Sequence, residues 1–176
     1  IFQNHSEWGP RALGNRSILF DPRHPNAKSI VNSVKKREHY RPFAVTCMLE
    51  YANDYFEMLQ LPESPWMSFA IQCKPKALKD IPTLVHADNT CRIQTVTEEQ
   101  NKNYYNLIKG FYERTGVPII FNTSFNLGGE AICETIYDAI DTCNRSMINH
   151  LYVPEDQEIE IPYECIRDKT EYIPAD

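Results

Sequence analysis

The amino-acid sequence predicts an α/β fold in which strands and helices alternate along one chain. Residues 103–114 place apolar side chains at the i, i+3, i+4, i+7 spacing of a helix, and Gly116 suits its C-cap. Residues 117–122 form an apolar, β-branched run without alternation, which is typical of a strand buried on both faces. The length of 176 residues, of which 42% are hydrophobic, suffices for one ordinary domain with a substantial core.

The first half of the chain is expected to contribute both helices and strands. Pro25 precedes a predicted helix over residues 26–38, whose apolar residues share one side. A buried strand over 43–49 follows, then a weakly helical stretch over 49–61, and then an alternating strand over 66–73. Alternation of this kind is typical of a sheet covered by helices.

The second half continues the alternation after a proline-containing loop, which is predicted over residues 74–90. A strand is expected over 92–96. The segment from Thr135 to Asp138 resembles a capping box, and the apolar stripe of the helix behind it extends to Met147. The remaining expectations are a last strand over 151–153, a domain over 1–153 and an acidic peripheral tail over 154–176.

Composition excludes several classes of protein. The net charge of −6 disfavours a general nucleic-acid partner, and the apolar runs are too short to cross a bilayer, so we expect no membrane partner either. The six cysteines show no zinc-ribbon spacing and no signal peptide precedes them, which favours reduced thiols in a cytoplasmic protein. Because the first residue is Ile1, the sequence is expected to be an excerpt of a longer chain.

Cations are concentrated near the start of the chain, where residues 1–45 contain eight Lys or Arg residues and three acidic residues. Such an asymmetry in an acidic protein favours a local anion site. Residues 7–17 combine two glycines with Arg11 and Arg16, whose planar guanidinium groups suit phosphate oxygens. A Gly/Pro turn with solvated arginines would explain the same residues without a ligand.

A second cationic segment contains Lys35, Lys36, Arg37 and Arg41, between a predicted helix and a predicted strand. The helix dipole alone would favour cations at this place. Cations at the edge of a sheet would instead be available to bind an anion. Both interpretations remain open at this point.

A third segment, residues 122–130, follows the most buried predicted strand and includes Asn122, Ser124 and Asn126 before a Gly-Gly pair. It places amides, a hydroxyl and backbone N–H groups at the carboxyl end of a strand, where open α/β sheets bind ligands. The segment is not a Walker loop, because no Gly-Lys-Ser/Thr follows. A turn in which Asn and Ser bond to their own backbone is the alternative.

Arg92 opens another predicted strand, after His86 and Asp88. A charge at this position is costly to bury unless an anion or a carboxylate partners it. His86 and Asp88 lack a third ligand, so no metal site is predicted. Since no Ser-His-Asp order is evident, these residues suit catalysis by positioning and charge neutralisation.

Several motifs, in the same order along the chain, resemble the C-terminal domain of NodU-type O-carbamoyltransferases. They are Gly-Pro-Arg-Ala-Leu-Gly-Asn-Arg-Ser at 9–17, Asp-Pro-Arg at 21–23, Val-Lys-Lys-Arg-Glu at 34–38, Arg-Pro-Phe at 41–43, His-x-Asp-x-Thr-x-Arg-x-Gln-Thr-Val at 86–96, Thr-Gly-x-Pro at 115–118 and Asn-Thr-Ser-Phe-Asn at 122–126. The resemblance covers residues 3–153.

The resemblance implies a YrdC-like fold, a twisted open mixed β-sheet with flanking helices and a cationic concave face. It also implies that carbamoyl adenylate forms from ATP, accompanied by Mg²⁺, and carbamoyl phosphate, with release of pyrophosphate. An N-terminal actin-like domain of the same polypeptide, absent from this sequence and holding iron, would then transfer the carbamoyl group to an acceptor hydroxyl. The implied protein is a biosynthetic, nucleotide-binding transferase.

The resemblance also assigns roles to individual residues. YrdC-like proteins carry Lys-x-Arg and Ser-x-Asn signatures, which match the sequence at 35–37 and 124–126. The residues implied to be catalytic are Arg92, Ser124 and Lys36. The residues implied to bind substrate or phosphate are Arg11, Arg16, Lys35, Arg37, Arg41, Asn122 and Asn126.

The sequence departs from the family pattern at two places. Asn4 and His5 stand where the family has Gly-Arg, so that arginine is missing, together with any phosphate contact that it makes in the family. Asn89 and Cys91 replace a glycine and an alanine of the family's His-Val-Asp-Gly-Thr-Ala-Arg motif. Because Asn tolerates positive φ, we expect the turn at Asn89 to be retained.

Two other functions compete with the enzyme. A non-catalytic YrdC-like module could bind a nucleotide or RNA, and RNA binding would show a steep salt dependence. A regulatory nucleotide sensor could use the same pocket. Pyrophosphate exchange that depends on carbamoyl phosphate would separate the enzyme from the sensor.

Overall fold

The computed structural model describes residues 1–154 and contains an open five-stranded mixed sheet. The order of its strands is β1 (Ser17–Phe20), β5 (Ile119–Ser124), β2 (Ala44–Met48), β4 (Thr90–Val96) and β3 (Ala70–Gln72). Strands β2 and β4 are parallel, whereas β1, β5 and β3 run antiparallel to their neighbours. This mixed sheet, flanked by helices, confirms the expected fold class.

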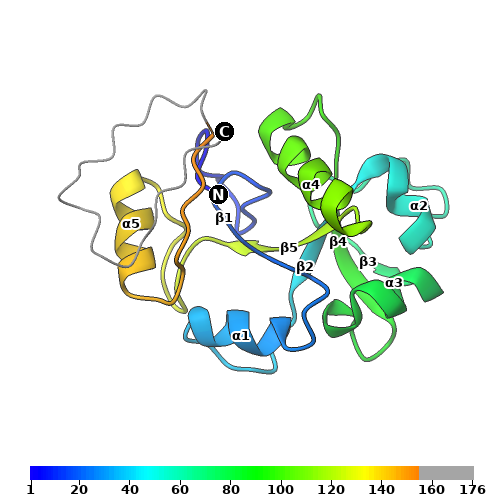
Figure 1. Ribbon diagram of the computed structural model, residues 1–176, viewed down its shortest axis with the longest axis horizontal. Coiled ribbons are helices and arrows are strands. Elements are labelled where there is room, and N and C mark those ends of the chain that lie inside the picture. Colours follow the sequence, from blue (N-terminus) through cyan, green and yellow to red (C-terminus); the bar gives the residue numbers. More distant parts are fainter. Residues whose placement is uncertain (155–176) are drawn as a thin grey trace.

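Helices cover both faces of the sheet (Figure 1). The longest, α4 (Lys102–Thr115), lies on one face, and α1 (Ala27–Val34) and α3 (Pro75–Asp80) lie on the other. Helix α5 (Ile136–Asn144) packs beyond β1, at the side of the sheet farthest from α3. The shorter elements are α2 (Ala52–Tyr55) and the 3₁₀ helices η1 (Leu49–Tyr51) and η2 (Pro82–Leu84).

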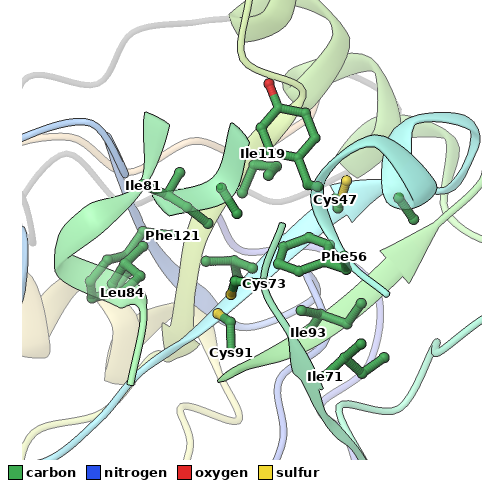
Figure 2. Packing of buried hydrophobic residues seen from close by; sticks show 14 of the residues in the cluster. Cys47, Phe56, Ile71, Cys73, Ile81, Leu84, Cys91, Ile93, Ile119 and Phe121 are labelled. Carbon is green, nitrogen blue, oxygen red and sulfur yellow. The ribbon is translucent and has the colours of Figure 1, made fainter. Parts of the chain in front are cut away.

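Separate apolar clusters fill the two faces. Val45 of β2 is the direct neighbour of Ile93 on β4 and of Phe121 on β5, and all three face the side that α1 and α3 cover. Figure 2 shows Ile93 and Phe121 in this cluster. Ile120 points to the opposite face, where it packs in a cluster with the fully buried Tyr104 of α4. Because successive residues of β5 enter different cores, the strand is apolar without alternation, as its sequence indicates.

Two predicted helix signals are confirmed. Gly116 ends α4 with a left-handed φ of 74°, and its N–H donates to the carbonyl oxygen of Tyr112. At α5 the Thr135 side chain accepts from the Asp138 N–H, while the Asp138 carboxylate accepts from the Thr135 N–H. These local signals concern neighbouring residues only, which is why sequence alone locates them.

The helix predicted over 26–38 is too long, because α1 ends at Val34 and Lys36 adopts a φ of +52°. The reason is local packing of the segment that follows. The buried Asn32 side chain donates to the carbonyl oxygens of His39 and Arg41, at 3.1 and 3.3 Å. These bonds fold residues 37–41 back against the helix instead of extending it.

Several strand and loop predictions are also corrected. The strand predicted over 66–73 is reduced to β3, since Met67 has a φ of +54°. The loop predicted over 74–90 contains α3 and η2, each with a proline in its first turn. Residues 151–153 form no strand, although the Phe2 N–H donates to the Tyr152 carbonyl at 3.0 Å.

The sequence reasoning missed β1, because Ser17 ends the glycine- and arginine-rich segment of residues 7–17 and only three apolar residues follow it. Helix α5 ends before Met147, which is exposed instead of joining the apolar stripe.

The acidic tail predicted over residues 154–176 lies, from residue 155 onward, outside the described residues. Within residues 1–154, no helix is long and apolar enough to cross a membrane.

Candidate anion-binding site

A pocket of about 90 Å³ opens at one end of the sheet. The carboxyl end of β5 and the amino ends of β2 and β4 meet there, because β5 runs antiparallel to β2. The pocket is lined by Pro10, Arg11, Ala12, Arg37, Pro42, Phe43, Ala44, Met67, Arg92, Asn122, Thr123 and Ser124. Five of the predicted site residues, from four separate segments, are therefore brought together.

Strand register explains the centre of the pocket. Ala44 of β2 is the direct partner of Arg92 on β4 and of Asn122 on β5. Directly paired residues project from the same face of a sheet. The methyl side chain of Ala44 therefore leaves room between a guanidinium group and an amide.

Three guanidinium groups line the pocket, and no carboxylate does. Arg37 is held in place by its Nε bond to Asn32 Oδ1 (2.7 Å) and by the Phe43 ring, 4.2 Å below its guanidinium carbon. Among the described residues, the guanidinium groups of Arg11 and Arg92 have no hydrogen-bond or ion-pair partner, and the Nε of Arg92 is buried. An anion is the partner that such groups lack.

Electrostatics in the pocket agree with this geometry. Burial, followed by the nearby charge of Arg11, lowers the pKa of Arg92. Burial also lowers the pKa of Arg37, and the charges of Arg41 and Arg92 add to the effect. Both shifts would be relieved by a bound anion, because an opposite charge favours the protonated form of a guanidinium group.

Asn122 is fixed by polar partners inside the sheet. Its Nδ2 donates to Thr46 Oγ1 (3.0 Å) and to Gln94 Oε1 (3.1 Å), while Gln94 Nε2 donates to the Leu13 carbonyl (3.1 Å). The Oδ1 of Asn122 is buried and unpartnered among the described residues. Sequence reasoning did not single out Thr46 or assign a role to Gln94. Both are polar residues in the middle of buried strands, and this position was the signal that could have identified them.

Lys35 joins the end of α1 to the loop after β5. Its ammonium group donates to the Ser124 carbonyl (2.5 Å), to Asn126 Oδ1 (2.8 Å) and to Ser124 Oγ (3.3 Å). The Gly128 N–H returns a bond to the Lys35 carbonyl (2.7 Å). Lys35 and Asn126 thus hold Ser124 in position beside the pocket, and neither of them lines it.

The environment of Lys35 changes its acidity. The residue is 2% exposed, and burial lowers its pKa to about 7, with a further contribution from the charge of Arg37. The three oxygen acceptors around the ammonium group favour its protonated form, which burial disfavours. A change of charge near Ser124 would therefore alter the protonation of Lys35 close to neutral pH.

Three other predicted residues lie away from the pocket. Arg16 is buried, donates to the carbonyls of Gln3, Asn4 and Glu134, and stacks over the Phe2 ring at 3.5 Å. Lys36 is exposed and does not line the pocket. Arg41 forms an exposed ion pair with Glu38 at 2.8 Å. The geometry thus gives Arg16 a structural role and does not place Lys36 or Arg41 in the pocket.

The segment before Arg92 is a hydrogen-bonded turn. Asp88 Oδ1 accepts from the Thr90 N–H (3.0 Å) and hydroxyl (2.7 Å), and the His86 ring nitrogen lies 3.2 Å from the same hydroxyl oxygen. Asn89 has a φ of +61°, so the turn expected at this position is present. No group of three or more potential metal ligands occurs in the described part of the chain.

Together the fold and the pocket define a class: an open mixed-sheet domain with a small cationic site for an anion. The sequence places the chain more narrowly, because residues 1–157 match the family described as "Carbamoyltransferase C-terminus". The chain therefore belongs to this family. The resemblance inferred from the motifs is confirmed.

Three relatives illustrate the relationship. The chain is 46% identical to nodulation protein NolNO of Sinorhizobium fredii, over 80% of the chain and 21% of that protein. It is 44% identical to nodulation protein NolO of Bradyrhizobium diazoefficiens, over 80% and 26%, and 37% identical to nodulation protein U of Rhizobium tropici, over 84% and 25%. The chain thus spans about a quarter of the length of these relatives.

Proposed function

We propose that this domain binds carbamoyl phosphate and ATP and forms carbamoyl adenylate, which supplies the carbamoyl group for transfer to a hydroxyl. The observation that carries the proposal is the meeting of Arg11, Arg37 and Arg92 in one pocket without a carboxylate. Membership of a carbamoyltransferase family supports the identity of the transferred group. The transfer itself, and the iron that the resemblance implies, would belong to the remainder of a longer polypeptide.

The size of the pocket favours the smaller substrate. Pockets that enclose drug-sized molecules measure roughly 300–1,000 Å³, whereas this pocket measures about 90 Å³. It accommodates a phosphate or carbamoyl group, and most of a nucleotide would lie outside it. The lining residues supply no carboxylate to Mg²⁺, so the metal would enter on the phosphates of ATP.

Atoms balance if carbamoyl phosphate, ATP and water give carbamoyl adenylate, inorganic phosphate and pyrophosphate. The bond between the carbamoyl carbon and the phosphate oxygen is hydrolysed, and an oxygen of the resulting carbamate then displaces pyrophosphate from the α-phosphorus. Arg92 and Arg11 would neutralise the phosphate oxygens, and Arg37 would add a third charge. The side chain of Asn122 would orient the carbamoyl amide through its unpartnered Oδ1.

Calorimetric titration with carbamoyl phosphate tests the central residue. Loss of one charge-assisted hydrogen bond costs about 1.5–3 kcal/mol, so Arg92→Ala should weaken binding by about tenfold to more than a hundredfold. Arg114→Ala makes the same charge change in the last turn of α4, before β5 begins, and should leave binding unchanged. Equal affinities of the two variants would remove Arg92 from the site.

Exchange of labelled pyrophosphate into ATP tests the chemistry. We expect exchange that requires carbamoyl phosphate and is lost in Arg92→Ala. Binding of ATP without any exchange, in a polypeptide that also contains the N-terminal region, would favour a nucleotide sensor instead. Failure of both ligands to bind would overturn the proposal.

A further inference from the structure

Strand β1 is an edge strand, and its outer side borders an apolar groove of about 590 Å³. All four residues of β1 line this groove. The remaining lining comes from the first residue, from α1 and α4, from the loop after β5 and from residues 147–152, namely Ile1, Ile30, Val31, Val34, Leu107, Phe125, Met147, Ile148, Asn149, His150 and Tyr152. An apolar edge of this kind is a template for pairing with another strand.

One end of this edge is already paired. The Ile1 nitrogen donates to the Ser17 carbonyl (2.8 Å), and the Ser17 N–H donates to the Ile1 carbonyl (3.1 Å). Phe2 forms an antiparallel bridge with Arg16. Residues 1–2 therefore start an antiparallel ladder along the outer side of β1.

The alternating direction of the backbone groups along β1 shows how this ladder would continue beyond Ser17. In an antiparallel sheet, the backbone groups of successive residues point to opposite neighbours. Since those of Ser17 point to Ile1, the N–H and C=O of Leu19 point to the same outer side and into the groove. A residue two positions before Ile1 in register would face Leu19.

The walls of the groove define the side chains that fit. Ile18 packs with Phe2 and Phe125, on the side of the sheet where α1 supplies Ile30 and Val34 to the groove. Leu19 packs with Ile1 and Leu107, on the side of α4. Because both sides are apolar, the groove fits an extended segment that is apolar on both of its faces.

We propose that β1 receives a sixth, antiparallel strand in the longer carbamoyltransferase, formed by the polypeptide that continues the ladder outward from Ile1. Such a segment would pair with Leu19 and fill the groove with apolar side chains. The relatives contain about three quarters of their length outside the matched region, so they have polypeptide available for this strand. The proposal does not depend on carbamoyl chemistry.

Hydrogen exchange of the Leu19 amide tests the proposal directly. One variant carries Lys-Thr-Val-Val-Val fused before Ile1, and its matched control carries Lys-Thr-Gly-Ser-Gly. We expect the valine extension to raise Leu19 protection by about tenfold or more over the unextended chain, and the glycine extension to leave it nearly unchanged. Far-UV circular dichroism establishes that all forms are folded, and Lys-Thr-Thr-Val-Thr replaces the valine version if that version aggregates.

Three outcomes would contradict the proposal. Equal Leu19 protection with the valine or threonine extension and with the glycine extension would show that no strand is added. A fall in protection after deletion of residues 155–176 from the unextended chain would assign the groove to that segment. Protection that rises with protein concentration, together with dimers in sedimentation, would assign it to a second copy of the chain.

Discussion

Arg11 and Arg16 belong to one nine-residue segment, residues 9–17, yet they occupy opposite environments. Arg11 lines the pocket and has no partner within residues 1–154, whereas Arg16 is buried among backbone carbonyl groups. Arg11 is therefore available to a ligand, whereas the guanidinium group of Arg16 is already bonded to backbone carbonyl groups. Similar residue types at close spacing do not imply a shared function.

The two glycines of this segment, Gly9 before Arg11 and Gly14 before Arg16, explain the difference. Gly14 has a φ of +93°, and a Cβ at this position would lie 2.1 Å from Cδ1 of the fully buried Tyr104 ring. Gly9 has no atom within 4 Å of its would-be Cβ. The segment thus passes from an open part, which borders the pocket, to a part that packs directly against α4.

Gly14→Ala and Gly9→Ala provide the largest contrast between the two parts. A positive φ costs a residue with a Cβ about 1 kcal/mol or more, and overpacking adds about 1–3 kcal/mol. Gly14→Ala should therefore lower the free energy of unfolding by about 2–4 kcal/mol, and Gly9→Ala by less than about 0.5 kcal/mol. Urea denaturation measures both values. A similar loss in both variants would show that the segment packs as one unit.

Arg16→Met and Arg11→Met sharpen the same comparison. Removing the Arg16 guanidinium takes the donor from the carbonyl oxygen of the buried Gln3, so stability should fall by about 1–3 kcal/mol. Arg11→Met should leave stability within about 0.5 kcal/mol and weaken carbamoyl phosphate binding by about tenfold or more. Weaker binding in a fully stable Arg16→Met protein would contradict this division of roles.

Burial of Lys35 should have a smaller effect on stability, namely a dependence of the free energy of unfolding on pH. Its pKa is about 7 in the folded protein and near 10.5 when unfolded, so the unfolded chain binds more protons between these values. Stability should therefore rise from pH 7 to 8.5, by roughly 1 kcal/mol per pH unit. Lys35→Met should lose this rise in urea denaturation at the two pH values. Equal slopes would mean that Lys35 stays charged throughout.

Sequence reasoning found the pocket residues better than it found the boundaries between elements. Arg92, Asn122 and Ser124 were recognisable because polar or charged residues at the ends of apolar strands require partners. The early end of α1 was not recognisable, since it depends on where the Asn32 amide finds its acceptors. Strand β1 was missed because three apolar residues beside a motif give a weak signal of secondary structure.

The sequence by itself determined the α/β class, the caps of α4 and α5, the family and the segments rich in anion-binding residues. These follow from local spacing and from ordered motifs, which depend on neighbouring residues. Only the tertiary structure decided which of the cationic side chains remain available to bind a ligand. Pairing of Ala44 with Arg92 on one side and with Asn122 on the other brings a charge into the pocket, whereas Arg16 and Lys35 are buried and bond to backbone and side-chain oxygens. The physical reason is that a cation is available to a ligand only where the fold supplies it with no acceptor of its own.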